Sequence, residues 1–384
     1  MSPPLLAVED LTTVFRTDKE TIRAVDGVSF SIERGETLGI VGESGSGKSV
    51  TARSIMGLVD SPGRIAETSS VRLDGEELNT PDTDWTGVRG GRIALVFQDP
   101  MTSLNPVYTV GNQIKESLLL HRGLRGREAT EEATELLRAV GIPDPARRLG
   151  EYPHQFSGGM LQRAVIAMAL ACDPDLLICD EPTTALDVTI QAQVLELLAD
   201  LRAEQDLALL FITHDMHVIA EIADRVGVMY AGEIVETGPV DAVFDDPAHP
   251  YAEGLLSCIP SRNVGRDRLD TIEGDVPTPT EPPSACRFAP RCPAAFDACE
   301  RVHPQRVPIG SEDDDGDADG SGNKAGGPAD GSGADRDVAC LLYPENESRS
   351  DRVRHHDRDG DAPDGGGHAS NAGGRGPDIE GGGR

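Results

Sequence analysis

The sequence contains little lysine and no long apolar run. Only four of the 384 residues are lysine, whereas Asp and Glu together number 66 and the formal net charge is −31. A chain of this kind lacks the basic stripe that meets phosphate backbones, which disfavours a role on nucleic acids. No apolar run approaches the about 18 residues that a membrane-spanning helix requires, and the start of the chain lacks the basic and apolar regions of a secretory signal. We therefore expect a cytoplasmic protein that reaches a membrane only through partners.

The acidic excess extends over the whole chain. Residues 311–384 account for −10 of the net charge, and the remaining residues account for −21. Abundant carboxylates with scarce lysine resemble the adaptation of cytoplasmic proteins to multimolar salt, where the Debye length falls to about 3 Å or less and self-repulsion is screened. This indicates an extreme halophile as the source. The alternative is a merely acidic protein from a low-salt cell.

The octapeptide at residues 42–49, GESGSGKS, fits the phosphate-binding pattern G-x-x-x-x-G-K-[ST] at every fixed position. The apolar run 38–41 before it predicts a strand, and residues 50–56 after it predict the first turns of a helix. In this context the glycines let backbone N–H groups turn toward a polyphosphate, and the helix N-terminus adds a positive dipole. Lys48 is expected to reach the β- and γ-phosphates, and Ser49 to bind Mg²⁺. The alternative is a Gly/Ser-rich turn that matches by chance.

Three further apolar runs each end in a residue suited to this chemistry. They cover residues 93–97, 176–179 and 207–213, followed by Gln98, by Asp180 and Glu181, and by His214. Continuous apolar runs of this length are typical of parallel strands buried on both faces, and open α/β sheets bind ligands beyond the carboxyl ends of such strands. We therefore expect Lys48 and these polar residues to converge on one edge of a sheet, as in a nucleotide hydrolase.

Each of these polar residues suits one task. Asp180 is a hard oxygen ligand for Mg²⁺, directly or through water. Glu181, one residue further along, can polarise the attacking water. Gln98 can contact both the metal and that water, and His214 can bond the γ-phosphate. The alternative for each residue alone is a surface or structural role, but the ordered set favours function.

A second glycine motif, Ser157-Gly158-Gly159, opens the apolar helical run 164–170. Ser157 is predicted to cap this helix, and the glycines expose the N–H groups of its first turn. This is a second anion site beside only one lysine-bearing loop. In a symmetric dimer each phosphate loop can therefore face the Ser-Gly-Gly motif of the other subunit.

In combination, these motifs resemble the ATP-binding subunit of an ATP-binding cassette (ABC) transporter over residues 5–260. The resemblance rests on the phosphate loop, the glutamine loop, the Ser-Gly-Gly signature, the acidic strand end, the loop after it and the histidine switch, at residues 42–49, 97–100, 157–159, 180–183, 185–187 and 212–215. Met160 departs from the Gln of many members. The resemblance implies an α/β fold with a mostly parallel sheet, and ATP hydrolysis in which Glu181, His214 and Gln98 are catalytic.

The resemblance also implies which residues bind the ligands, with Phe15 in the place of an adenine-stacking aromatic. The expected ATP-binding set is Phe15, Gly42, Glu43, Ser44, Gly45, Ser46, Gly47, Lys48, Ser49, Gln98, Ser157, Gly158, Gly159 and His214. The expected Mg²⁺ set is Ser49, Gln98 and Asp180.

Further segments narrow the resemblance to the oligopeptide/dipeptide importers, a subfamily that includes nickel importers. They are residues 99–106, 249–251, 255–256, 259–260 and the cysteine-bearing 286–293. The resemblance implies two membrane permease subunits, a second ABC ATPase subunit, identical or homologous, and an extracellular solute-binding protein. It places the chain on the cytoplasmic side of the cell membrane. The expected cargo is a peptide, and the alternative is nickel or another small solute.

The composition divides the chain. We expect residues 1–255 to form the nucleotide-binding domain, with a mostly helical insert at about 100–170. Residues 256–345 are proline-rich and carry four cysteines. Residues 310–337 within them, and the tail 346–384, are rich in Gly, Asp and Ser and are predicted to be disordered.

The cysteines fall into two groups. Three have apolar neighbours and are expected to be inert core residues: Cys172, Cys179 and Cys258. The other four have polar, proline-rich neighbours: Cys286, Cys292, Cys299 and Cys340. Four such thiolates can hold zinc or a [4Fe–4S] cluster, and their spacing leaves the choice open. The subfamily resemblance favours the iron–sulfur cluster over zinc.

Two other classes of protein share parts of this pattern. A soluble cassette ATPase that acts on DNA or ribosomes usually has coiled-coil arms or two cassettes in one chain, and this sequence has neither. A structural subunit with a dead site would not retain Lys48, Glu181 and His214 together. We therefore predict the ATPase subunit of an importer.

Overall fold

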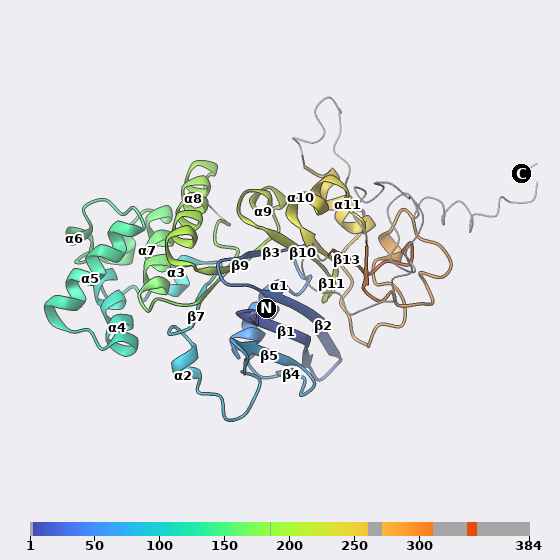
Figure 1. The fold of residues 1–384 in the computed structure, drawn as a ribbon, viewed down its shortest axis with the longest axis horizontal. Helices are drawn as coiled ribbons and strands as arrows, with labels where there is room; N and C mark the ends of the chain where they lie inside the picture. The colour runs from blue at the N-terminus through green and yellow to red at the C-terminus, as the bar shows by residue number, and fades with distance from the viewer. Residues whose placement is uncertain (1–2, 185, 260–270, 310–335, 344–384) are drawn as a thin grey trace, which may run out of the picture.

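The computed structural model describes residues 3–184, 186–259, 271–309 and 336–343. The predicted disordered tail 346–384 lies outside these residues, and so does the predicted acidic insert up to residue 335. Within the described residues two β-sheets form the centre of the molecule (Figure 1). A group of helices lies at one end, and the described residues 271–309 and 336–343 lie at the opposite end (Figure 1).

In the described part of the chain, the larger sheet has eight strands in the order β12-β13-β11-β10-β3-β9-β8-β7. Its centre is parallel and consists of β3 (Thr37–Val41), β7 (Ile93–Val96), β8 (Leu176–Asp180), β9 (Ala208–Thr213) and β10 (Arg225–Tyr230). The apolar runs predicted as strands before the phosphate loop, Gln98, Asp180 and His214 are β3, β7, β8 and β9, so these predictions are confirmed. The antiparallel β11 (Glu233–Pro239) continues the sheet beyond β10.

The central strands are apolar along their whole length because both faces of the sheet are covered. Every residue of β9 is buried. Leu210 and Ile212 pack into the core that contains β1, β2 and α1, whereas Leu209 and Phe211 pack into the core on the other face. Burying such a side chain contributes about 1.5–3 kcal/mol relative to leaving it exposed. The continuous apolar runs therefore reflect the burial of both faces of the sheet, as parallel sheets require.

The smaller sheet is antiparallel and covers one face of the larger one (Figure 1). It consists of β1 (Leu6–Arg16), β2 (Thr21–Ile32), β4 (Gly63–Ile65), β5 (Ser70–Leu73) and β6 (Glu76–Glu77). Helix α1 (Lys48–Ile55) contacts both β1 and β8, so it lies between the two sheets. The short helix α2 (Trp85–Val88) leads from this sheet to β7.

The predicted helical insert appears as the helices between β7 and β8. They are α3 (Pro100–Ser103), α4 (Val110–Arg122), α5 (Gly126–Ala139), α6 (Pro145–Arg148), the 3₁₀ turn η1 (Pro153–Gln155) and α7 (Gly158–Leu170). The helices that follow are α8 (Val188–Gln205), α9 (Met216–Ile222), α10 (Val240–Asp245) and α11 (Pro250–Ser257). Helix α7 packs against α3, α4, α5 and α8 and against β7, and so joins the insert to the sheet.

The described residues 271–309 and 336–343 form what we call the extension. They contain the 3₁₀ turn η3 (Ala289–Arg291) and the strands β12 (Val307–Pro308) and β13 (Asp337–Val338). Strand β13 pairs with β11, so the extension adds two strands to the larger sheet. The segment 310–337 was predicted to be disordered, yet at its end Arg336 is buried and pairs with the fully buried Glu236. A buried charge requires such a partner, which fixes this end of the segment.

Candidate nucleotide site

The phosphate loop connects β3 to α1 and has the conformation that its glycines allow. Gly47 has φ of +109°, and a Cβ added there would lie 2.3 Å from the carbonyl oxygen of Ala24. Only glycine fits this left-handed and crowded position. The backbone can therefore curl ahead of the first turn of α1, where free N–H groups point toward the loop.

Lys48 lies inside this loop. Its Nζ donates to the carbonyl oxygens of Gly42 at 2.7 Å and Glu43 at 3.0 Å, and the residue is 4% exposed. Burial lowers the pKa of the Lys48 ammonium, and the nearby carboxylates of Glu181, Asp180 and Glu43 act in the opposite direction. A buried ammonium group whose hydrogen bonds go to two neutral carbonyl oxygens suits the binding of an anion.

The acidic strand end lies directly beside the loop. The hydroxyl of Ser49 donates to Oδ1 of Asp180 over 2.8 Å. Burial raises the pKa of Asp180, although the hydrogen bond from Ser49 opposes the shift. The hydroxyl and the carboxylate are both hard oxygen ligands, so this pair fits Mg²⁺.

Three side chains converge on the carboxylate of Glu181. Its Oε2 accepts hydrogen bonds from Nε2 of Gln98 at 3.0 Å and from Oγ1 of Thr184 at 3.0 Å. Nδ1 of His214 lies 3.3 Å from the same oxygen. Glu181 has φ of +50°, which is uncommon for a residue with a side chain and costs free energy that the surrounding contacts must offset.

These side chains surround one cavity of about 910 Å³. Its lining combines the phosphate loop with Gln98, Glu181, Thr184 and His214, so the predicted convergence on one sheet edge is observed. The lining also includes Ala24, Leu255 and residues 274–276, which the sequence analysis did not select. No local pattern identifies these last residues, because they reach the cavity only through the packing of the extension.

Two of the expected ATP-binding elements lie away from this cavity. Phe15 pairs with Ile22 and Gly63 in the smaller sheet and is not in the lining. Ser157 caps α7 by accepting a hydrogen bond from the N–H of Met160, and Ser157 and Gly158 are both exposed. The start of the Ser-Gly-Gly motif therefore lies at the surface of the chain, whereas Gly159 is buried.

None of the seven cysteines, all of which lie in the described residues, forms a disulfide bond. Burial raises the pKa of Cys172 to about 11 and that of Cys179 to about 12, which keeps both thiols protonated at neutral pH. Burial also raises the pKa of Cys340 to about 12, and the thiols of Cys286, Cys292 and Cys299 add to the rise. Cys286, Cys292 and Cys299 therefore lie within electrostatic range of Cys340. Among the described residues no group of three or more His, Cys, Asp or Glu side chains is arranged to hold a metal ion, so the iron–sulfur site stays a prediction.

The chain matches two known families. Residues 25–184 match the family described as ABC transporter, and residues 235–299 match the oligopeptide/dipeptide transporter C-terminal region. Among the helices of the described residues, none is both long and apolar enough to span a membrane.

Several relatives are similar over most of their length. A putative peptide import ATP-binding protein of Brucella abortus is 55% identical over 78% of this chain and 91% of its own. The oligopeptide transport ATP-binding protein AppD of Bacillus subtilis is 53% identical over 77% of this chain and 90% of its own. The dipeptide transport ATP-binding protein DppD of Haemophilus influenzae is 49% identical over 80% of this chain and 93% of its own.

Solved structures agree with this assignment. The dimeric structure of a bacterial ABC transporter cassette matches with a TM-score of 0.55 and 30% identity, over 61% of this chain and 98% of that one. A post-hydrolysis dimer of an ATP-binding cassette with ADP and Pi matches with a TM-score of 0.55 and 29% identity, over the same shares. With the phosphate loop, the acidic strand end and the convergent Gln98 and His214 in one cavity, these likenesses show that the chain belongs to the ATP-binding subunits of ABC transporters, in the group that carries the oligopeptide/dipeptide transporter C-terminal region.

Proposed function

We propose that this protein hydrolyses ATP to drive the import of dipeptides or oligopeptides through an ABC transporter. The observation that carries the proposal is the convergence of Gln98, Thr184 and His214 on Glu181, in the cavity that holds the phosphate loop. The peptide cargo is supported by relatives whose names specify peptide, oligopeptide or dipeptide transport.

In the proposed site the phosphate loop holds the phosphates of ATP, and Lys48 meets the β- and γ-phosphates. Ser49, Gln98 and Asp180 hold Mg²⁺, which neutralises phosphate charge. Glu181 polarises the attacking water, and His214 bonds the γ-phosphate beside it. Phosphoryl transfer depends mainly on such positioning and charge neutralisation, so residues that already contact one another suit it.

The protein is proposed to act as a pair with an identical or homologous ATPase subunit. The exposed Ser157 and Gly158 support this arrangement, since their N–H groups are free to face the phosphate loop of a second subunit. Dimeric structures of similar cassettes support it as well.

The proposed partners in the membrane are two permease subunits, supplied with cargo by an external binding protein, and the chain would bind them at the cytoplasmic face. The segment after Gln98 is the proposed contact. It exposes large apolar side chains at Met101, Val107 and Tyr108, and Phe97, just before Gln98, is exposed as well. A groove of about 290 Å³ lies beside it, with Phe97, Ser103 and Met168 in its lining. Apolar surface next to the γ-phosphate site suits a partner helix that must respond to the nucleotide.

We further propose that residues 1–255 form the nucleotide-binding unit and that Cys286, Cys292, Cys299 and Cys340 in the following segment bind a [4Fe–4S] cluster. Two observations support the cluster: none of these four described cysteines forms a disulfide bond, and three of the thiols influence the pKa of the fourth. Thiolates are the usual ligands of such clusters. Bound zinc is the alternative.

Reconstitution tests the main proposal. The chain is combined in proteoliposomes with the two permeases, the second ATPase and the binding protein, and ATP-dependent uptake of a labelled dipeptide is measured. Uptake that is lost in Lys48→Ala supports the proposal. Uptake of nickel and not of peptide would show that the cargo is nickel. ATP hydrolysis stimulated by nucleic acid but not by the permeases would show that the protein is a soluble cassette ATPase and not a transporter subunit.

A further inference from the structure

The extension contacts the phosphate loop directly through Arg291. Nη1 of Arg291 donates to Oε2 of Glu43 over 2.7 Å, and Nη2 donates to Oε1 over 3.0 Å. The pair is therefore bidentate, the strongest geometry for an arginine and a carboxylate. The side chain of Arg291 is only 6% exposed and that of Glu43 is 31% exposed, so the pair is partly screened by solvent.

Glu43 is held at three points of its structure. Its carboxylate binds Arg291, its N–H donates to the hydroxyl of Tyr251 over 2.9 Å, and its carbonyl oxygen accepts from Nζ of Lys48. Because Glu43 is the second residue of the phosphate loop, these contacts together fix the start of the loop. One of the three comes from the extension.

Arg291 is itself fixed within the extension. Its Nε donates to the carbonyl oxygen of Glu273 over 2.9 Å, and its guanidinium lies 5.7 Å from the ring centre of Tyr230. The segment that begins at Glu273 continues into residues 274–276, which line the nucleotide cavity. The guanidinium of Arg291 therefore connects the segment 273–276, which borders the cavity, to the start of the phosphate loop.

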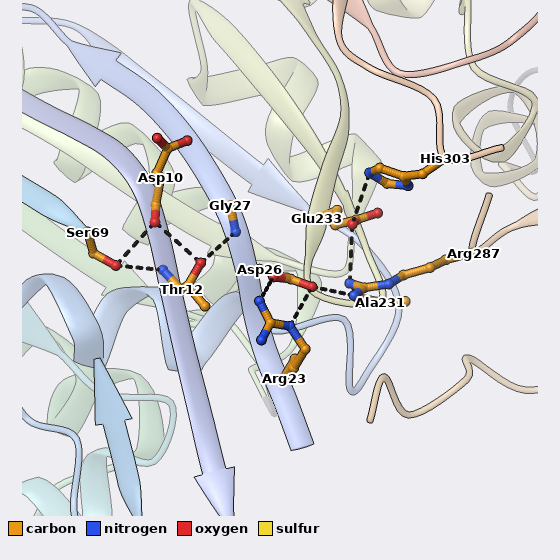
Figure 2. Close-up of polar contacts among 10 residues, drawn as sticks. All are labelled: Asp10, Thr12, Arg23, Asp26, Gly27, Ser69, Ala231, Glu233, Arg287 and His303. Carbon is orange, nitrogen blue, oxygen red and sulfur yellow. Dashed lines mark hydrogen bonds and ion pairs between the residues drawn. The ribbon is translucent and has the colours of Figure 1, made fainter. Parts of the chain in front are cut away.

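A second arginine anchors the extension on the other side of the loop. Figure 2 shows Arg287 between Asp26 and Glu233, with a hydrogen bond of 2.6 Å to the carbonyl oxygen of Ala231. The next residue, Gly232, donates its N–H to the carbonyl oxygen of Ser46 in the phosphate loop over 2.8 Å. Phe288, 2% exposed, packs edge-on against Tyr230 and Tyr251 between the two anchors. The extension is thus packed rigidly against the loop.

The charge of Glu43 gives this contact a consequence for ATP. A carboxylate in a phosphate loop repels the phosphates that the loop must bind, and at short range in a partly buried site this repulsion is substantial. Arg291 neutralises the carboxylate by binding both of its oxygens. Loss of Arg291 would leave the repulsion in place and free the start of the loop.

We propose that the extension is part of the nucleotide site, with Arg291 as a positioning residue that neutralises Glu43 and fixes the phosphate loop for ATP. The inference rests on the proposed nucleotide site. By linkage, ATP binding must stabilise the contact between Arg291 and Glu43 as much as that contact favours ATP. Structural changes in the extension that disturb this contact therefore alter the affinity for ATP.

The experiment measures the Kd of the full chain for the non-hydrolysable analogue AMP-PNP with Mg²⁺, by calorimetry. Arg291→Gln is expected to raise Kd about tenfold, the effect of losing one charge-assisted pair and exposing its partner. Adding Glu43→Gln to Arg291→Gln is expected to recover about threefold or more, because the repelling charge is gone. Arg306→Gln is the matched control: Arg306 also fixes the extension, through Asp337 and the carbonyl oxygen of Ser29, but does not contact the loop, and its Kd should equal that of the wild type.

A purely structural role makes the opposite prediction for the double variant. Binding as weak as in Arg291→Gln alone, or weaker, would overturn the proposal, as would wild-type affinity in Arg291→Gln. Arg291→Lys, which keeps the charge and loses the fork, serves if Arg291→Gln does not fold. It is expected to weaken binding about threefold, and wild-type affinity would again overturn the proposal. Lys48→Ala tests the proposed nucleotide site separately from the role of Arg291. If Lys48→Ala binds AMP-PNP as well as the wild type does, the nucleotide site itself is wrongly placed.

Discussion

Gln98 and Glu181 are joined by a hydrogen bond of 3.0 Å, although they are 83 residues apart in the sequence. Gln98 follows β7 and Glu181 follows β8, which are adjacent parallel strands. The bond therefore connects the residue proposed to polarise water with the segment proposed to contact the permease. A displacement of either side chain changes the hydrogen bond to the other, and we propose that this link couples hydrolysis to transport.

The first prediction concerns the catalytic carboxylate. Glu181→Gln should retain ATP binding and slow turnover by a factor of about 10² or more, because the amide cannot polarise the attacking water. Phosphate release with the reconstituted partners measures turnover. Glu196→Gln, on the exposed face of α8, is the matched control and should behave as the wild type. Near-normal turnover in Glu181→Gln would remove this residue from the catalytic role.

The second prediction concerns the permease contact. A cysteine at Thr102 or Ser103 in α3 should form a crosslink with a short cytoplasmic helix of the permease, since this segment leaves the γ-phosphate site and exposes Met101 beside it. A second cysteine is introduced into that permease helix, and gel analysis after mild oxidation detects the disulfide between the two subunits. A cysteine at the exposed Glu204 near the end of α8 should give no crosslink. Crosslinks confined to cysteines in the extension would move the docking surface there.

The third prediction concerns the cysteines of the extension. Protein purified without oxygen should be brown and contain about four iron atoms per chain, as four thiolates of one [4Fe–4S] cluster require. Cys292→Ser should lose the colour and make the extension more sensitive to protease. Cys258→Ser, whose thiol bonds the carbonyl oxygen of Gly254 in α11, should keep the colour. If the protein contains stoichiometric zinc and no iron, the four cysteines bind zinc and not a cluster. If it contains neither metal, the four thiols are not metal ligands.

The fourth prediction concerns salt. The melting temperature should rise by about 5 °C or more between millimolar and molar KCl, roughly 2 kcal/mol for a domain of this size. The reason is the net charge of −31, whose self-repulsion is screened as the Debye length shortens. Betaine at equal osmolality controls for preferential exclusion, which stabilises without screening. A melting temperature independent of KCl contradicts adaptation to high salt and leaves the ATPase proposal intact.

The fifth prediction concerns Glu233, which faces Arg287 at 3.4 Å and His303 at 3.5 Å, with Asp26 and Arg23 beyond (Figure 2). Burial raises the pKa of Glu233 from 4.5 to about 7. The folded state therefore holds a proton that the unfolded chain has released, so this stabilising contribution is complete below pH 4.5 and is lost as the pH rises to about 7.

Glu233→Gln should remove the loss of stability that accompanies ionisation of Glu233. Between those pH values the free energy of unfolding should fall less steeply with pH than in the wild type, by at most about 1.4 kcal/mol per pH unit. Urea unfolding at several pH values gives the slopes. Glu196→Gln should keep the wild-type slope, because Glu196 lies on the exposed face of α8. Equal slopes in Glu233→Gln and the wild type would show that the carboxyl is ionised throughout.

The sequence by itself determined the central sheet and the core of the site. Each apolar run became a buried strand, and the polar residue after it was placed at the shared carboxyl edge, because parallel strands of one sheet end together. This reasoning located Lys48, Gln98, Asp180, Glu181 and His214 without any knowledge of packing. It depends only on short segments, in which a residue and its strand are neighbours in the chain.

Only the tertiary structure decided what else surrounds that site. Thr184 lies in a loop with no periodic pattern, residues 274–276 line the cavity through the fold of the extension, and Arg291 meets Glu43 across 248 positions of the chain. The burial of Arg336 at the end of an acidic, glycine-rich segment likewise depends on Glu236, 100 positions away. Such contacts arise when distant surfaces pack, because the free energy of a buried ion pair depends on where both partners lie and not on their neighbours in sequence.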